Sequence, residues 1–195
     1  MKVRNLYKSF GEKQVLHGFS ADIADNAITC IMGKSGSGKT TLLNILASLL
    51  AADRGSVEGR PDRISFMFQE DRLCDAFSAE RNVRLVTGKA VDRAVIADNL
   101  RKVGILDQGP VRFFSGGMRR RVALVRTMLY DAPLVMMDEP FKGLDGETKK
   151  QAMEYVKQFD GKATILCVTH DEEEARALSA RILRMEEANG GNADE

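Results

Sequence analysis

One loop of this sequence combines glycines, a lysine and hydroxyl side chains at a spacing that suits phosphate chemistry. The residues GKSGSGKT match the pattern G-x-x-x-x-G-K-[ST] in full, and a second threonine follows. Glycines let successive backbone N–H groups form an anion nest, to which the following helix adds its positive end. The lysine supplies a charge for the outer phosphates, and the hydroxyl supplies a hard oxygen for Mg²⁺. We therefore predict that ATP and Mg²⁺ bind at Gly33, Lys34, Ser35, Gly36, Ser37, Gly38, Lys39, Thr40 and Thr41.

An apolar strand that ends in two acids is the second candidate for chemistry. Residues 134–139 read LVMMDE, and the carboxyl ends of parallel strands face the ligand crevice. Neighbouring side chains on a strand point in opposite directions, so Asp138 and Glu139 suit different tasks. One can hold Mg²⁺ through water, while its neighbour orients the attacking water as general base. By itself, such a strand end is also typical of an ordinary solvated surface.

Two further polar side chains follow apolar strands and are predicted at the same crevice. Gln69 closes RISFMF, where its amide could reach Mg²⁺ or the attacking water, and His170 follows TILCVT. A lone histidine is more often structural, but a position at the carboxyl end of a strand favours a functional role. His17 keeps a structural interpretation, because it lies in a half-buried strand with no carboxylate nearby in sequence.

Three other features allow both a functional and a structural interpretation. FSGGM opens a helix, where Ser115 with Gly116 and Gly117 could hold an anion or form an ordinary N-cap. Phe10 could stack on an adenine ring or pack in the core. The basic run Arg119–Arg121 has apolar neighbours on its helix, so we predict a solvated helix face rather than a nucleic-acid site.

These candidates need a scaffold, and the hydrophobic pattern indicates an α/β fold. Strands of a mostly parallel sheet are predicted at AITCIM, RISFMF, PLVMMD, TILCVT and RILRM, with helices covering both faces. KVRNLYKSF and VLHGFSADI predict an N-terminal antiparallel β subdomain. The mainly helical stretch before residue 130 predicts an inserted subdomain over about 70–130. We expect a single domain over 1–195, with an acidic, frayed tail over about 186–195.

Whole-chain properties exclude several classes of protein. With 195 residues, 44 % hydrophobic and 29 % charged, the chain has ordinary soluble composition and can form one core. A net charge of +1 is too balanced for a nucleic-acid binder that relies on bulk electrostatics. The polar start and the lack of a run near ~20 apolar residues predict neither signal peptide nor membrane span. Cys30, Cys74 and Cys167 form no CxxC pair, which favours a reducing cytoplasm, and the apolar runs around Cys30 and Cys167 favour core packing of these two.

Taken in order, the motifs resemble those of the nucleotide-binding subunit of an ATP-binding cassette (ABC) transporter. The resemblance extends from about Val3 to Met185 and rests on GKSGSGKTT, Gln69, FSGGM, LVMMDEP, GLD and His170. FSGGM is similar to the motif that separates this family from other P-loop ATPases. The resemblance implies a P-loop NTPase core and real ATPase activity, because the residues that carry the chemistry are intact.

The resemblance also implies a role for each matching residue. The phosphate loop holds the phosphates, with Thr40 and Gln69 on Mg²⁺ and Asp138 behind it. Glu139 is the general base, and His170 contacts the γ-phosphate.

A second subunit and a membrane partner follow from the same resemblance. Phe10 stacks on adenine, and Asp145 lies in the loop that joins two sites across a dimer. Ser115 and Gly117, with Gly116 between them, act on the ATP of the opposing subunit. We thus expect a homodimer on the inner, cytoplasmic face of the membrane, bound to integral permease subunits. An extracytoplasmic substrate-binding protein is a further expected partner, and nucleic acid is not.

Longer matches point to one group of importers. FMFQEDRLCDAFSAERNV, SGGMRRRVALVR and DEPFKGLD are most similar to importer subunits of the nitrate, sulfonate and taurine group. Met118 replaces a common glutamine, and Asp71 and Cys74–Ala76 replace the usual Pro and Leu-Pro-Trp, which leaves the cargo open. An exporter subunit is the first alternative. A soluble cassette protein acting on ribosomes or DNA is the second, although such proteins usually carry two cassettes or long inserts.

Overall fold

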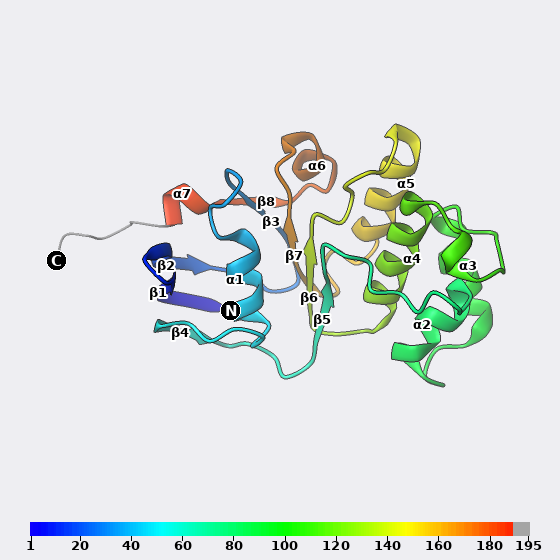
Figure 1. Ribbon diagram of the computed structural model, residues 1–195, viewed down its shortest axis with the longest axis horizontal. Helices are drawn as coiled ribbons and strands as arrows, with labels where there is room; N and C mark the ends of the chain where they lie inside the picture. The colour runs from blue at the N-terminus through cyan, green and yellow to red at the C-terminus, as the bar shows by residue number, and fades with distance from the viewer. Residues whose placement is uncertain (189–195) are drawn as a thin grey trace.

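Two sheets of opposite character organise the chain in the computed structural model, which describes residues 1–188. An antiparallel sheet has the order β2-β1-β4, with β1 at Lys2–Phe10, β2 at Lys13–Asp22 and β4 at Arg54–Glu58. A parallel sheet has the order β5-β6-β7-β3-β8, with β3 at Ile28–Met32, β5 at Ile64–Met67, β6 at Leu134–Asp138, β7 at Thr164–Val168 and β8 at Arg181–Arg184. Figure 1 shows the antiparallel sheet at one end of the long axis and the parallel sheet in the middle.

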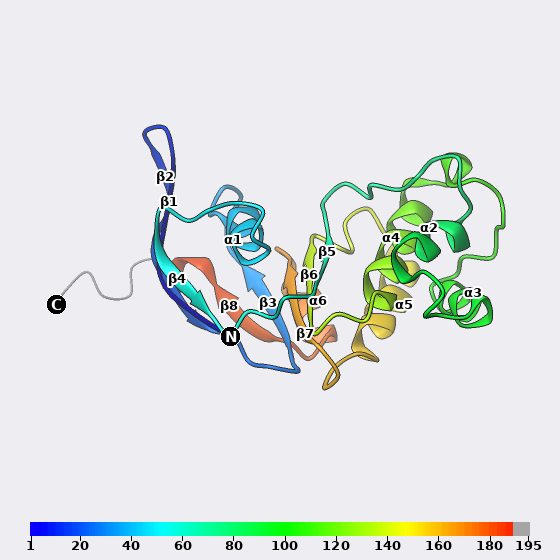
Figure 2. The ribbon, with the colours of Figure 1, turned by 90° about the horizontal axis from the view of Figure 1, so that it is seen from below.

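The central strands of the parallel sheet are buried on both faces because their residues are apolar throughout. Alternate side chains of β6 serve two separate cores. Leu134 and Met136 pack in the core that includes α1 (Lys39–Leu46) and the antiparallel sheet. Val135 and Met137 pack in the core that includes α4 (Gly116–Leu129) and α5 (Gly146–Lys157). The layers are visible in Figure 2, where α1 lies between the two sheets and α4 and α5 lie beyond β6.

Three helices occupy the stretch between β5 and β6. They are α2 (Ala79–Thr87), α3 (Arg93–Lys102) and α4, and a short 3-10 turn (Val111–Phe113) precedes the last of them. Ser78 begins α2 as its N-cap, because its hydroxyl accepts a hydrogen bond from the Arg81 N–H at 3.2 Å. These helices form the end of the molecule opposite the antiparallel sheet (Figure 1). Boundaries at about 70 and 130 stay our proposal for an inserted subdomain.

The last described elements return the chain to the phosphate-binding loop. They are α6 (Glu172–Ala177), β8 and α7 (Met185–Ala188). The prediction that Met185 ends the last strand is wrong, since this residue begins α7 and is fully buried beneath Gly33. Residues 186–188 of the predicted tail belong to α7, and the remainder of that tail lies outside the described residues.

Two sequence-based expectations concern burial and hydropathy. Cys30 and Cys167 are direct neighbours on β3 and β7 and are fully buried, which confirms their prediction as core residues. Among the described residues, no helix has both the length and the hydropathy that a membrane crossing requires.

Candidate functional site

The phosphate-binding loop joins β3 to α1 and depends on two glycines in left-handed conformations. Gly36 and Gly38 have φ angles of +80° and +94°, values that side chains with a Cβ rarely adopt. A Cβ on Gly38 would also lie 2.8 Å from the Val15 side chain. Gly38 is the N-cap of α1 and supplies no side-chain cap, so the first N–H groups of this helix are available to an anion.

Lys39 folds back over the same loop. Its ammonium donates to the carbonyl oxygens of Gly33 at 2.8 Å and Lys34 at 2.9 Å. The Lys34 N–H donates in turn to the Glu186 carboxylate at 3.1 Å, which ties the start of the loop to α7. The cation therefore lies at the loop with weak neutral acceptors, which a phosphate would replace with stronger charged ones.

A threonine and a buried carboxylate meet at the other side of the loop. The Thr40 hydroxyl donates to the Asp138 carboxylate at 2.7 Å, and Asp138 is only 3 % exposed. Burial raises the pKa of Asp138, and the hydrogen bond from Thr40 opposes that effect.

The donor set fits Mg²⁺ held together with a phosphate group. The hydroxyl of Thr40 and the carboxylate of Asp138 are hard oxygen ligands of the kind that Mg²⁺ takes. No group of three or more His, Cys, Asp or Glu side chains that could hold a metal occurs within residues 1–188. Mg²⁺ usually binds through one or two carboxylates and substrate phosphates, which matches this sparse set.

Glu139 is the centre of a cluster of side chains from three strand ends. Its carboxylate accepts hydrogen bonds from Lys142 at 2.6 Å and Gln69 at 3.2 Å, and lies 3.7 Å from the His170 ring nitrogen Nδ1. Its backbone has a φ of +49°, a strained value for a residue other than glycine. The hydrogen bond from Lys142 is the main reason that the pKa of Glu139 is lowered. An ionised carboxylate at this position can accept a proton from water.

The fold thus brings Gln69, Glu139 and His170 together, as the strand-end argument predicts. His170 is 71 % exposed, which agrees with the functional interpretation better than with a structural one. The side chain of Phe10 is 51 % exposed at the end of β1, so the alternative of core packing is wrong. Its ring stays open to a stacking partner, with the Lys8 ammonium 5.7 Å from the ring centroid.

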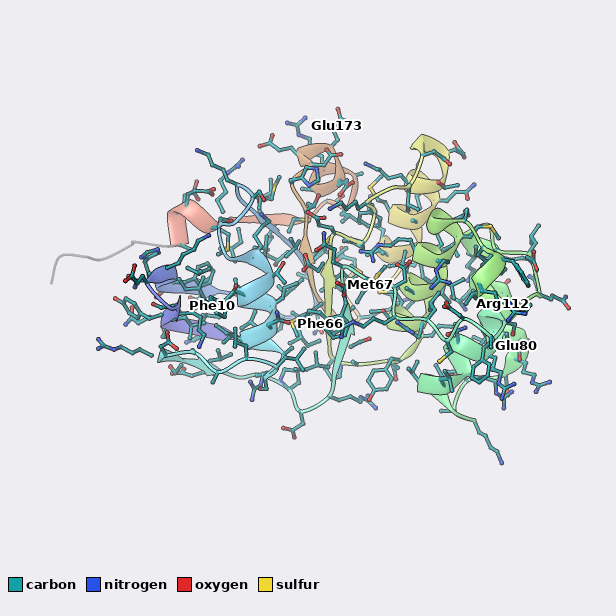
Figure 3. All side chains as sticks on the ribbon, viewed as in Figure 1. Phe10, Phe66, Met67, Glu80, Arg112 and Glu173 are labelled. Carbon is teal, nitrogen blue, oxygen red and sulfur yellow. The ribbon has the colours of Figure 1, made fainter. Side chains whose placement is uncertain are left out.

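Ser115 and Asp145 begin helices at a second location. Ser115 is the N-cap of α4, where its hydroxyl accepts from the Met118 N–H, and Asp145 caps α5 through the Thr148 N–H. A Cβ on Gly117 would lie 3.4 Å from Leu144, so the two loops are neighbours. Within residues 1–188, no hydrogen bond joins either loop to the phosphate-binding loop. Figure 3 shows Phe10 and Arg112, shortly before Ser115, on opposite sides of the parallel sheet.

The basic run on α4 corrects one expectation. Arg120 and Arg121 are 5 % and 8 % exposed, so the prediction of a solvated helix face is wrong for both. Backbone carbonyls satisfy their guanidinium groups, as in the 2.6 Å bond from Arg121 to Val103, and burial lowers the pKa of Arg121. The sequence does indicate burial of Arg120, because this residue lies one helical turn before Leu124 and therefore on the apolar face of the helix.

Comparison with known proteins gives consistent matches. Residues 16–142 match the family model described as ABC transporter. Aliphatic sulfonates import ATP-binding protein SsuB 1 of Pseudomonas syringae pv. syringae is 35 % identical over 95 % of this chain and 80 % of its own length. SsuB 3 of Paraburkholderia xenovorans is 38 % identical over 95 % of this chain and 76 % of its own length.

Solved structures agree in fold. The dimeric post-hydrolysis state of the ATP-binding cassette MJ0796, bound to ADP and Pi, superposes with a TM-score of 0.80. It is 28 % identical in sequence, and the match covers 94 % of this chain and 93 % of that one.

Replacement of Lys39 tests the phosphate-binding loop. We expect Lys39→Ala to raise the dissociation constant for ATP by roughly ten- to a hundredfold, because the phosphates lose a charged donor. The matched control is Lys162→Ala. Lys162 is exposed and precedes β7 at the end of the strand away from His170, so its loss should change affinity by about twofold at most. Calorimetric titration with ATP measures both, and equal affinities for the two variants would contradict the assignment.

Proposed function

This chain belongs to the ABC transporter family, and we propose that it powers import through a membrane permease. The chain is an ATPase with the α/β fold of this family's cassettes, as the resemblance predicted. The observation that carries our assignment of its catalytic centre is the cluster around Glu139. One ionised carboxylate there contacts Gln69 and lies near His170, at the same sheet edge as Asp138 and the phosphate-binding loop.

The names of the relatives support the direction of transport. Those with 34–38 % identity are aliphatic sulfonate import proteins, which favours import over export. They give no support to a soluble cassette protein that acts on ribosomes or DNA. Asp71 and Cys74–Ala76 differ from the usual importer pattern, so our proposal covers the direction of transport and not the cargo.

The chain's own residues divide the work at the phosphates. Backbone N–H groups of the loop bind the phosphate oxygens, and Lys39 exchanges its two carbonyl acceptors for them. Thr40, Asp138 and Gln69 would hold Mg²⁺, which neutralises charge on the phosphate oxygens. Glu139 orients the attacking water and takes its proton, while His170, whose Nδ1 lies 3.7 Å from the Glu139 carboxylate, would contact the outermost phosphate.

A second copy of the chain would complete the site. Ser115, Gly116, Gly117 and Asp145 lie at loops that make no hydrogen bond with their own phosphate-binding loop within residues 1–188. Cassettes of this fold have been solved as dimers. We therefore place two copies face to face, so that each presents Ser115 and Gly117 to the ATP on the other. Phe10, exposed at the end of β1, would stack on the adenine.

The membrane partners follow from the importer assignment. We propose that the dimer binds integral permease subunits at the cytoplasmic face of the membrane. The permease in turn would receive its cargo from an extracytoplasmic substrate-binding protein.

Loss of the Glu139 carboxylate tests the general-base role. Glu139→Gln keeps the size of the side chain but cannot accept a proton, so we expect turnover to fall by about a hundredfold or more. ATP affinity should stay within about threefold, because the amide leaves the phosphate-binding loop unchanged. The control is Glu147→Gln, an exposed glutamate in the first turn of α5. A phosphate-release assay that finds near-normal turnover in Glu139→Gln would refute the role.

Purification from membranes tests the transport role. We expect an affinity-tagged chain, expressed in its native host, to bring down an integral membrane protein after extraction with mild detergent. A matched strain without the tag controls for carry-over, and mass spectrometry identifies the partner. Recovery of the chain only in the soluble fraction together with ribosomes would overturn the transport assignment.

A further inference from the structure

Arg120 is a buried cation whose donors all find acceptors at one edge of the parallel sheet. This edge carries Gln69, Glu139 and His170, which we call the catalytic cluster. Its Nη2 donates to the carbonyl oxygens of Asp138 and Glu139, each at 2.7 Å. Its Nη1 donates to the carbonyls of Phe68 and Gln69, each at 2.9 Å, and Nε reaches the Pro140 carbonyl at 3.2 Å. One guanidinium thereby binds five backbone carbonyls.

These carbonyls lie at the carboxyl ends of two adjacent strands. The pairing of β5 with β6 ends at Met67 and Met137, so beyond this point the two strands no longer bond to each other, although Asp138 still pairs with Val168 of β7. A buried carbonyl without a donor destabilises the fold, so a side chain that donates several hydrogen bonds is needed here. Arg120 is 5 % exposed and supplies it from α4.

The two segments held in this way carry Gln69 and Glu139. Their side chains are in contact at 3.2 Å, and both backbones bond to the same guanidinium. Any shift of one segment relative to the other would change this distance and the orientation of the Glu139 carboxylate, whose backbone is already strained.

An ion pair extends the connection to the segment after Gln69. Arg120 Nη1 lies 3.1 Å from the Asp71 carboxylate, and both side chains are shielded, at 6 % and 18 % exposure. Arg126 of the same helix donates to the carbonyl of Asp71 at 2.8 Å.

We propose that Arg120 is a positioning residue for ATP hydrolysis. It fixes Gln69 and Glu139 relative to each other, and its pair with Asp71 makes the segment after Gln69 part of the same unit. Arg120 acts through the residues that it holds. The inference rests on the proposed role of Glu139 as general base.

The neighbouring residue offers a matched control. Arg119 forms an ion pair with Asp75 at 2.7 Å, so it also links α4 to the segment that follows Gln69. This second pair is more exposed, at 26 % and 65 %, and within residues 1–188 the side-chain hydrogen bonds of Arg119 go to Asp75 and Val111 and not to Gln69, Glu139 or His170. Equivalent substitutions at positions 119 and 120 therefore separate the positioning effect from a general effect of arginine loss on α4.

The experiment compares Arg120→Lys and Arg120→Gln with Arg119→Lys and Arg119→Gln. Turnover is divided by the number of nucleotide-binding sites, determined by titration, so that loss of folded protein does not count as loss of catalysis. We expect kcat to fall by about tenfold or more in both Arg120 variants, while KM for ATP changes by about threefold at most. Lysine should retain more activity than glutamine, because it keeps the charge opposite Asp71. Both Arg119 variants should stay within about twofold of the parent protein.

Asp71→Asn keeps the test decisive if the Arg120 variants do not fold. It removes the ion pair but leaves all five carbonyl bonds, and we expect kcat to fall by about threefold with KM unchanged. Parent-like kcat in the folded Arg120 variants, or in Asp71→Asn where those do not fold, would overturn the inference.

The failure of this inference differs from a failure of the proposed function. Glu139→Gln is measured in the same assay as a reference. If that variant turns over normally, the general-base assignment fails. If it is inactive while Arg120→Lys is normal, only the positioning role fails.

Discussion

Backbone carbonyls that leave a parallel sheet at its carboxyl edge must find donors, and this requirement shapes the site. Parallel strands end together, so the groups that leave the ladder gather where the ligand binds. In this chain the Arg120 guanidinium donates hydrogen bonds to carbonyls at the ends of both β5 and β6. The position of Arg120, and hence of α4, is thereby tied to the strand ends. The same side chain therefore satisfies the carbonyls at this edge and fixes the backbone of Gln69 and Glu139.

Charge is balanced at the same edge. Lys39 and Lys142 lie opposite two adjacent carboxylates, one buried and one partly exposed. Burial raises the pKa of Asp138, whereas the hydrogen bond from Lys142 lowers that of Glu139. Two acids that are neighbours in the chain therefore receive different environments, which suits one to metal binding and the other to proton transfer. The difference comes from their places at the strand end, because Asp138 is the buried last residue of β6, whereas Glu139 follows the strand with a φ of +49°.

Local patterns in the sequence predict most of the fold and part of the site. Continuous apolar runs identify the central strands, and the rule that strand ends face a ligand is enough to bring Gln69, Glu139 and His170 together. Arg120 cannot be found in this way, because its acceptors on Phe68 and Gln69 are more than fifty positions away in the chain. Its spacing from Leu124 on α4 indicates a buried face, but only the three-dimensional arrangement shows what satisfies a buried cation there.

The central claim is that one chain carries half of each site, with Ser115 and Gly117 serving the nucleotide on a second copy. Light scattering with Glu139→Gln protein measures this directly, since we expect that variant to bind ATP without hydrolysing it. With saturating ATP and Mg²⁺ the account predicts a particle of about twice the 21.5 kDa of the chain, and a monomer without nucleotide. A mass that stays at that of one chain when every site holds ATP would contradict it.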